Sequence, residues 1–221
     1  MNTQARPYLV GITGGSASGK TRFLNELGQL FNKNEVCFLS QDNYYKSTEH
    51  HTKDENGHVN YDLPSCIDLD AFKTDILKLC NNEPVKRREY RFQHNEQLGK
   101  WLEYLPAPII IAEGLFIFYE KEIFKQFDLK IFIDASEDVQ LERRINRDTN
   151  ERNISREFIL YQWKNHVKPA FEQYLLPYKE KADVVINNNK HFNNSLKVIE
   201  DHFRMILNQA QNTQLNIEKS L

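Results

Sequence analysis

Residues 14–21, with the sequence GGSASGKT, have the composition and spacing of a phosphate-binding loop. They match the pattern G-x-x-x-x-G-K-[ST], in which glycines adopt backbone angles that a Cβ would forbid, so that successive N–H groups turn inward around a polyphosphate. The lysine would bring a positive charge to the β- and γ-phosphates, and the threonine hydroxyl would bind Mg²⁺. The candidate nucleotide-binding residues are therefore Gly14, Gly15, Ser16, Ala17, Ser18, Gly19, Lys20 and Thr21.

Two carboxylates follow apolar runs that are typical of buried strands. Asp42 comes shortly after the run 35–40, and Glu113 follows the run 108–112. Because ligands of open α/β folds bind at the carboxyl ends of the parallel strands, we expect both side chains beside the phosphate-binding loop. Asp42 could accept the proton of an acceptor hydroxyl, and it could join Thr21 and Glu113 in holding Mg²⁺. By its position alone, Asp42 could also be a helix cap or a turn residue.

Three arginines are spaced to meet on one face of a predicted helix. Arg143 and Arg147 are four residues apart, and Arg144 and Arg147 are three apart, so a helix presents them as one cationic patch. Such a patch suits phosphoryl transfer, in which cations stabilise negative charge on the phosphate oxygens. The alternative is a solvated helix face, whose acidic partners would be Glu142, Asp148 and Glu151.

These residues need a sheet to position them, and the chain alternates between strand-like and helix-like segments. Residues 8–13 are apolar, and residues 22–31 have helical apolar spacing. Strands that alternate with helices predict an α/β fold with a doubly wound parallel sheet and right-handed crossovers. We expect further strands at 35–40, 108–112, 129–134 and 182–186, and further helices at 68–80 with Asp68 as cap, from 136 to a break at 150–155, at 156–167 before Pro169, and at 193–209.

Two segments interrupt this alternation. Residues 46–60 are polar, and we expect a flexible loop on the substrate side in which His50, His51 and His58 are solvated. Residues 85–92 and 99–105 alternate charged with apolar or aromatic side chains, and the polar turn between them is typical of a hairpin. We expect an antiparallel insertion at about 85–105 that covers the ligand.

The 221 residues carry a formal net charge of −2 and are 40% hydrophobic and 27% charged, which suits one domain over residues 1–221 with a frayed polar tail at about 210–221. The near-neutral balance gives no reason to expect a nucleic-acid or membrane partner. Cys37, Cys66 and Cys80 lack metal-site spacing and fit a reducing compartment. Because no apolar run is long enough for a signal peptide or a membrane span, we expect a cytoplasmic protein.

Several segments together resemble the uridine kinase family, the uridine-cytidine kinases, which are phosphate-loop kinases related to phosphoribulokinase. The similarity runs from residue 11 to about residue 186. The segments that carry it, besides 11–21, are LSQDNYY at 39–45, NYDLP at 60–64, EG at 113–114, RRINRD at 143–148 with ER at 151–152, and VKPAF at 167–171. The resemblance implies the phosphate-loop kinase fold, with the hairpin insertion and a helical lid at about 143–156.

The resemblance assigns roles on the phosphate side of the site. Asp42 resembles the catalytic base of the family, and Lys20 and Arg147 would share the catalytic work with it. Thr21 and Glu113, with Asp42, resemble the Mg²⁺ site. Arg147 and Arg152 resemble lid arginines that clamp phosphate as the site closes.

The resemblance also assigns roles on the acceptor side. Asp62 matches a carboxylate that grips the ribose hydroxyls, since a carboxylate can accept two hydroxyl donors, and Arg144 and Gln162 resemble its companions. The residues that resemble the pocket around the pyrimidine are Tyr45, Tyr61, Tyr90, Phe92 and His94. Without the family pattern, these aromatic side chains would be read as ordinary core or hairpin packing.

The family similarity implies a nucleoside kinase that transfers the γ-phosphate of ATP or GTP, with Mg²⁺, to the 5′-hydroxyl of uridine, and of cytidine as a second substrate, in pyrimidine salvage. It also implies a homo-oligomer, a tetramer or a dimer. Two departures affect recognition of the base: Arg91 replaces an aspartate of the family, and Ile154 replaces an arginine. The alternatives are a related kinase for another ribosyl or hydroxyl substrate, and a nucleotide-binding regulator without catalysis.

Overall fold

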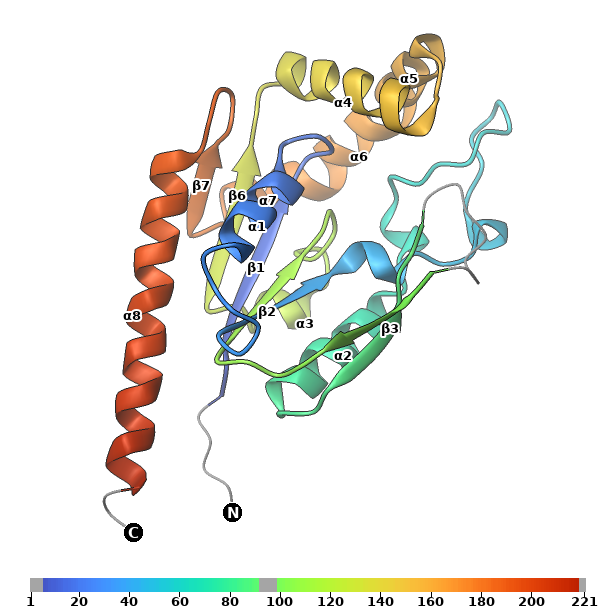
Figure 1. Ribbon diagram of the computed structural model, residues 1–221. Helices are drawn as coiled ribbons and strands as arrows, with labels where there is room; N and C mark the ends of the chain where they lie inside the picture. Colours follow the sequence, from blue (N-terminus) through green and yellow to red (C-terminus); the bar gives the residue numbers. More distant parts are fainter. Residues whose placement is uncertain (1–5, 92–98, 219–221) are drawn as a thin grey trace.

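A five-stranded parallel sheet forms the centre of the molecule in the computed structural model, which describes residues 6–91 and 99–218 (Figure 1). Its strands lie in the order β2-β5-β1-β6-β7. Their bounds are β1 Tyr8–Gly14, β2 Val36–Ser40, β5 Ile109–Glu113, β6 Leu129–Asp134 and β7 Val184–Asn187. The predicted parallel sheet of an α/β fold is therefore confirmed, with strand ends that differ from the predicted ones by a residue or two.

Both faces of the central strands β5, β1 and β6 are covered, which explains their continuous apolar runs. Successive residues of β1 enter different cores, because strand side chains alternate between faces: Leu9 packs on one side and Val10 on the other. Helices α1 (Lys20–Gly28) and α8 (Asn193–Glu218) cover the face to which Val10 points. Helix α2 (Leu69–Cys80), helix α3 (Lys121–Phe124) and the end of the helical stretch before β7 cover the other face.

The register of three neighbouring strands fixes where their ends lie. Ile12 of β1 pairs with Glu113 of β5, and Glu113 pairs with Ser40 of β2. The chain leaves β1 at the phosphate-binding loop and leaves β2 two residues before Asp42. The loop and the two carboxylates therefore leave the sheet at the same level.

Local sequence signals place the smaller elements as expected. Asp68 caps α2, since its carboxylate accepts a hydrogen bond of 3.0 Å from the N–H of Ala71. Strands β3 (Val85–Arg88) and β4 (Trp101–Tyr104) pair antiparallel, which confirms the hairpin arms but shortens them. The turn predicted between them lies outside the described residues.

The helical stretch before β7 differs from its prediction. We expected a helix that stops before Pro169, but helical backbone continues from Arg156 to Lys179. The stretch consists of α5 (Arg156–Gln162), α6 (Lys168–Ala170) and α7 (Leu176–Lys179), separated by the π-helical segments η5 (Trp163–Val167) and η6 (Phe171–Leu175). A proline lacks the N–H that an interior α-helical turn needs, and wide π turns on both sides change the backbone pairing around it.

Helix α4 (Glu137–Arg152) begins after Ser136 as predicted and ends at Asn153, which has the left-handed angles typical of a helix end. Helix α8 is longer than predicted. It continues to Glu218, so residues 210–218 are helical rather than frayed. In the described part of the chain, no helix combines the length and apolar character that a membrane span requires.

Packing of α8 against the sheet yields a first prediction. Phe203 is fully buried in the core beneath α1, with its ring 5.9 Å from that of Phe31. Phe203→Ala should lower the free energy of unfolding by about 3–5 kcal/mol, because it leaves a cavity in a packed core. Val198→Ala, on the 66% exposed position of the same helix, is the control and should change the stability by less than about 0.5 kcal/mol. Equal urea midpoints for both variants would contradict the packing.

Candidate active site

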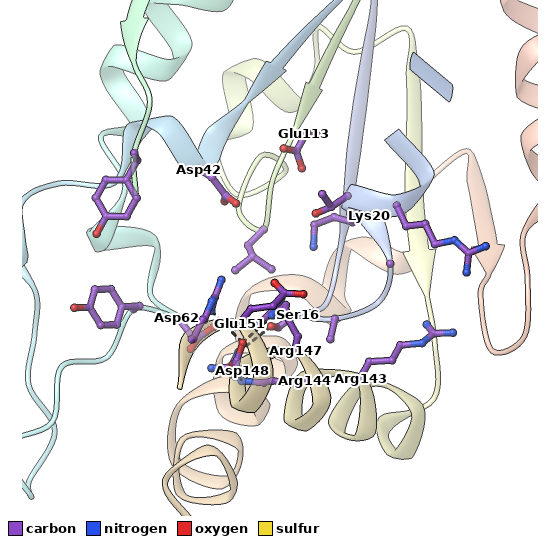
Figure 2. A pocket seen from close by; sticks show the side chains of 18 of the residues that line it. Ser16, Lys20, Asp42, Asp62, Glu113, Arg143, Arg144, Arg147, Asp148 and Glu151 are labelled. Carbon is purple, nitrogen blue, oxygen red and sulfur yellow. Dashed lines mark hydrogen bonds and ion pairs between the residues drawn. The ribbon is translucent and has the colours of Figure 1, made fainter. Parts of the chain in front are cut away.

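A cavity of about 940 Å³ opens at the carboxyl ends of β1, β2 and β5 (Figure 2). The phosphate-binding loop and α4 bound one side of it, and residues around the hairpin and the loop 46–62 bound the other. Most of the predicted site residues line it, namely Ser16, Ala17, Gly19, Lys20, Thr21, Asp42, Tyr45, Tyr61, Asp62, Tyr90, Glu113, Arg144, Arg147, Arg152 and Gln162. Gly14, Gly15 and Ser18 complete the loop without lining this cavity, and Phe92 and His94 lie outside the described residues.

The phosphate-binding loop is held in its shape by close backbone packing. Gly19 has a φ of 101°, and a Cβ there would collide with the amide of Asn188, which donates a hydrogen bond of 2.8 Å to the carbonyl of Ser18. The carbonyl of Asn188 in turn accepts a hydrogen bond of 2.9 Å from Arg143. Asn188 is buried after the last strand, and no sequence pattern pointed to its contact with the loop.

Lys20 projects from the start of α1 toward the two carboxylates (Figure 2). Its ammonium donates hydrogen bonds of 2.8 and 3.1 Å to the carbonyls of Gly14 and Gly15. The surrounding protein lowers the pKa of Lys20, and the negative charges of Glu113 and Asp42 oppose this shift. The lysine therefore lies within electrostatic reach of both carboxylates at one edge of the sheet.

Asp42 and Glu113 face the cavity from neighbouring strands. Burial and the negative charge of Asp42 raise the pKa of Glu113 to about 7, against a hydrogen bond from Ser40 and the charge of Lys20. The side chain of Asp42 is exposed to the cavity, which is itself enclosed by protein. This burial raises the pKa of Asp42, against the positive charges of Lys20, Arg152 and Arg147. Two carboxylates that are difficult to ionise together form a donor set that a divalent cation would stabilise.

The donor set fits Mg²⁺ bound together with phosphate. In the described residues, no cluster of three or more His, Cys, Asp or Glu side chains could hold a metal ion alone. Mg²⁺ is commonly held by one or two carboxylates together with phosphate oxygens and water. Glu113, Asp42 and the hydroxyl of Thr21 all line the cavity and could supply the protein share of such a site.

The turn that carries Asp42 is held in place by hydrogen bonds. It is the 3₁₀ segment η1 (Gln41–Tyr44), and the hydroxyl of Ser40 accepts a hydrogen bond from the N–H of Asp42. The buried side chain of Gln41 accepts a hydrogen bond of 2.8 Å from the N–H of Phe116, and Tyr44 donates one of 2.9 Å to Asp75. The turn is thereby tied to the segment after β5 and to α2.

Three of the four arginines of α4 are organised around one buried carboxylate rather than on a solvated face, whereas Arg143 contacts Asn188. Asp148 is fully buried and lies 3.3 Å from Arg144, 2.7 Å from Arg147 and 3.3 Å from Arg152. Arg144 also donates a hydrogen bond of 2.8 Å to the hydroxyl of Ser16 in the phosphate-binding loop. Three cations share one anion, so this side of the cavity keeps a net positive charge. The i, i+4 spacing of 144, 148 and 152 was the available signal for the role of Asp148.

The acceptor end of the cavity is aromatic and acidic. The rings of Tyr45 and Tyr90 stack with centroids 5.2 Å apart, and Asp62 lines the cavity beside them. Arg144 donates a hydrogen bond of 3.3 Å to Gln162 at the same end. Arg91 and Ile154, the two departures from the family pattern, both line this cavity.

One histidine of the loop 46–60 is not solvated as predicted. His50 and His58 are exposed, but His51 is buried. Its ring lies 6.3 Å from that of Tyr45 and 5.0 Å from that of Tyr61, so the wall of the acceptor end covers it. The prediction was wrong because the loop folds so that Tyr45, which precedes it, and Tyr61, which follows it, enclose His51.

A phosphate-binding loop after the first strand, with acidic side chains at the ends of the next two strands across the sheet, β5 and β2, is the arrangement of the phosphate-loop kinases. Comparison with known proteins leads to the same class, and the protein is an ATP-dependent kinase. Within the class, the chain belongs to the phosphoribulokinase/uridine kinase family, whose model matches residues 9–195.

Similar proteins narrow the activity to that of a nucleoside kinase at the level of the family. The chain is 32% identical over 212 residues to uridine-cytidine kinase 2-B of Danio rerio, covering 92% of this chain and 81% of that protein. It is 28% identical over 210 residues to the uridine kinase of Lactobacillus helveticus, covering 95% and 100%. Because the chain belongs to this family of kinases, the alternative of a nucleotide-binding regulator without catalysis is set aside.

Solved structures share the fold. Phosphoribulokinase from Rhodobacter spheroides superposes with a TM-score of 0.62 at 16% identity, covering 84% of this chain and 71% of that one. A possible uridine kinase from Bacillus stearothermophilus superposes with a TM-score of 0.56 at 20% identity, covering 82% and 89%. At these identities the similarity concerns the fold alone, and it confirms the predicted phosphate-loop kinase type.

The buried carboxylate of α4 yields a second prediction. Asp148→Asn should lower the free energy of unfolding by about 3–5 kcal/mol, because three buried or half-buried guanidinium groups lose their shared anion. Glu142→Gln removes an exposed charge from the same helix and should change the stability by less than about 0.5 kcal/mol. Chemical denaturation of both variants would measure the difference, and similar losses would favour a solvated helix face.

Proposed function

We propose that this protein transfers the γ-phosphate of ATP or GTP to the 5′-hydroxyl of uridine, and of cytidine as a second substrate, giving the nucleoside monophosphate. The observation that carries the proposal is the single cavity in which Lys20, Asp42 and Glu113 meet at one edge of the sheet, with Asp62 and stacked tyrosines at the other end. Uridine kinases among the similar proteins support the choice of nucleoside.

In the proposed mechanism, the loop amides and Lys20 hold the β- and γ-phosphates. Thr21, Glu113 and Asp42 would hold Mg²⁺, which neutralises charge on the phosphate oxygens when it is bound. Arg147 and Arg152 add positive charge from α4, where Asp148 orients their guanidinium groups. The negative charge of the transition state would therefore be met by cations on two sides.

On the acceptor side, Asp62 would accept hydrogen bonds from the two ribose hydroxyls, beside Arg144 and Gln162. Tyr45, Tyr61 and Tyr90 would pack against the base. Asp42 would take the proton of the 5′-hydroxyl. At the same time the 5′-oxygen would bond to the γ-phosphorus, and the bond between that phosphorus and the β,γ-bridging oxygen would break. A raised pKa suits this role, because a general base is most effective when its pKa approaches the working pH.

A second candidate is a related kinase that acts on another ribosyl or hydroxyl substrate. Arg91 and Ile154 favour it, because both line the cavity where the family pattern has other side chains. The phosphate side of the site would be the same for both candidates. Only the acceptor separates them.

A screen tests the proposal directly. Purified protein, MgATP or MgGTP and a panel of nucleosides and small alcohols should give UMP from uridine, detected as a new monophosphate by chromatography. Lys20→Ala should abolish the product, and Asp42→Asn should lower kcat by about 10²- to 10⁴-fold without a matching change in the KM of the donor. A product from a different alcohol alone would favour the second candidate.

Asp62 separates the two candidates more finely. Asp62→Ala should raise the KM for uridine by about tenfold or more, because a charge-assisted contact to the ribose hydroxyls is lost. The KM for ATP should stay within about twofold, since the phosphate contacts remain. The 2′-deoxynucleoside should be a poor substrate of the wild type and should lose little further activity in the variant. An unchanged KM for uridine would mean that the pocket does not hold a ribose diol at Asp62.

A further inference from the structure

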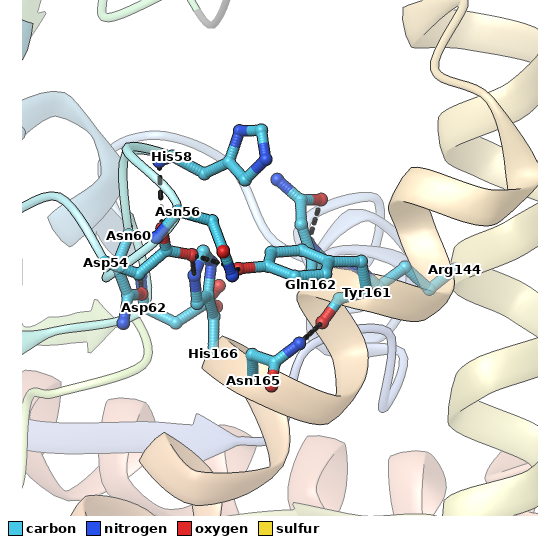
Figure 3. A network of polar contacts seen from close by, with 10 residues as sticks. All are labelled: Asp54, Asn56, His58, Asn60, Asp62, Arg144, Tyr161, Gln162, Asn165 and His166. Carbon is cyan, nitrogen blue, oxygen red and sulfur yellow. Dashed lines mark hydrogen bonds and ion pairs between the residues drawn. The ribbon is translucent and has the colours of Figure 1, made fainter.

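A polar network joins the loop 51–60 to the stretch that begins with α5, away from the phosphate-binding loop (Figure 3). One oxygen of Asp54, Oδ2, accepts a hydrogen bond of 2.6 Å from the hydroxyl of Tyr161 and lies 2.7 Å from Nε2 of His166. The side chain of His166 is 1% exposed and that of Asp54 is 17% exposed. We call these three side chains the Asp54 latch.

The two oxygens of Asp54 have different partners. Oδ1 accepts hydrogen bonds of 2.9 Å from the backbone N–H groups of Asn56 and His58 and so shapes the turn of the loop. Oδ2 is used for the helical stretch alone. Because an ionised carboxylate can only accept, Tyr161 and His166 must both donate to it. These donors hold the pKa of Asp54 well below its usual range.

Other contacts of the loop follow the same course. The side-chain amide of Asn56 donates a hydrogen bond of 2.7 Å to the hydroxyl of Tyr161, which thus accepts one bond and donates another. The ring of His58 lies 4.9 Å from that of Phe158 and 5.1 Å from that of Tyr161. The loop is therefore fastened to the helix by charge, by hydrogen bonds and by ring contacts.

Each end of the latch leads to a residue of the acceptor end. On the loop side, the N–H of Asn60 donates a hydrogen bond of 2.9 Å to the carbonyl of Thr52, two residues before Asp54, and the side chain of Asn60 accepts one of 2.9 Å from the N–H of Asp62. On the helix side, Gln162 directly follows Tyr161 and accepts a hydrogen bond from Arg144. Asp62, Gln162 and Arg144 all line the cavity. The latch thus connects two elements that both line the acceptor end.

We propose that Asp54, Tyr161 and His166 are positioning residues, which hold the loop against α5 and thereby fix the position of Asp62 relative to Gln162 for the acceptor. They do not line the cavity and would act only through these two side chains. The inference rests on the proposed function in one respect, since the acceptor is taken to be the molecule that Asp62 binds. The fastening of the loop does not depend on that function.

Asp54→Asn is the sharpest test, because it keeps an oxygen for the backbone N–H groups of the turn and replaces the oxygen that grips the helix with a donor. The KM for the acceptor should rise by about tenfold, the loss expected of one charge-assisted hydrogen bond, while the KM for ATP stays within about twofold. Tyr161→Phe, which keeps the ring, should raise the acceptor KM in the same way. The double variant should be little worse than either single variant, because both changes break one network.

Glu55→Gln is the matched control, since it removes one exposed negative charge from the same loop and should leave both KM values unchanged. Limited trypsin digestion provides a readout that needs no substrate. Cleavage after the exposed Lys53 should be about fivefold faster in Tyr161→Phe than in the wild type, which has the same residues around the cleaved bond, because the loop opens more often.

The outcomes are distinguishable. Equal cleavage rates in Tyr161→Phe and the wild type would overturn the latch, whatever the enzyme phosphorylates. Faster cleavage with an unchanged acceptor KM would overturn the positioning role. Absence of any nucleoside product from the wild type would defeat the proposed function, while the digestion would still decide whether the latch holds the loop.

Discussion

The register of three parallel strands is the constraint on which the site depends. Ile12, Glu113 and Ser40 lie side by side across β1, β5 and β2, so the phosphate-binding loop, Glu113 and Asp42 all emerge at one level. Because side chains alternate along a strand, a slip of one residue would turn every side chain to the other face. Burial of both faces therefore enforces the geometry of the site as strictly as it enforces the core.

Charge is distributed in the cavity so that neither sign is neutralised completely. The sheet edge contributes two carboxylates, and burial together with the charge of Asp42 raises the pKa of Glu113. Helix α4 contributes guanidinium groups that gather around Asp148, while Lys20 is hydrogen-bonded to the carbonyls of its own loop. A polyphosphate with its metal ion carries both signs and would match both walls at once.

Much of the fold could be predicted, because its signals are local. Continuous apolar runs report strands that are buried on both faces, and Asp68 combined with helical spacing reported the start of α2. The same signals located the loop, Asp42 and Glu113, since a residue at the end of a central parallel strand can lie only at one edge.

The features that could not be predicted depend on contacts between distant residues. The rule that proline stops a helix considers only the backbone, and it failed at Pro169, where π turns flank the proline. His51 reads as a loop histidine until Tyr45 and Tyr61 enclose it. Tyr161 and His166 contact Asp54 across 107 and 112 residues of sequence, and no periodicity reports such a pair.

The π turns also allow the helical stretch 156–179 to contact both the active-site cavity and the hydrophobic core. Each additional residue in a turn advances the angular phase of the following side chains by roughly 100°, so positions beyond a π turn point where an uninterrupted α-helix would not direct them. Gln162, just before the first π turn, lines the cavity of the active site. Leu175, at the end of the second π turn, packs in the hydrophobic core beneath the sheet. The chain thereby rotates its apolar stripe without a break in the helix.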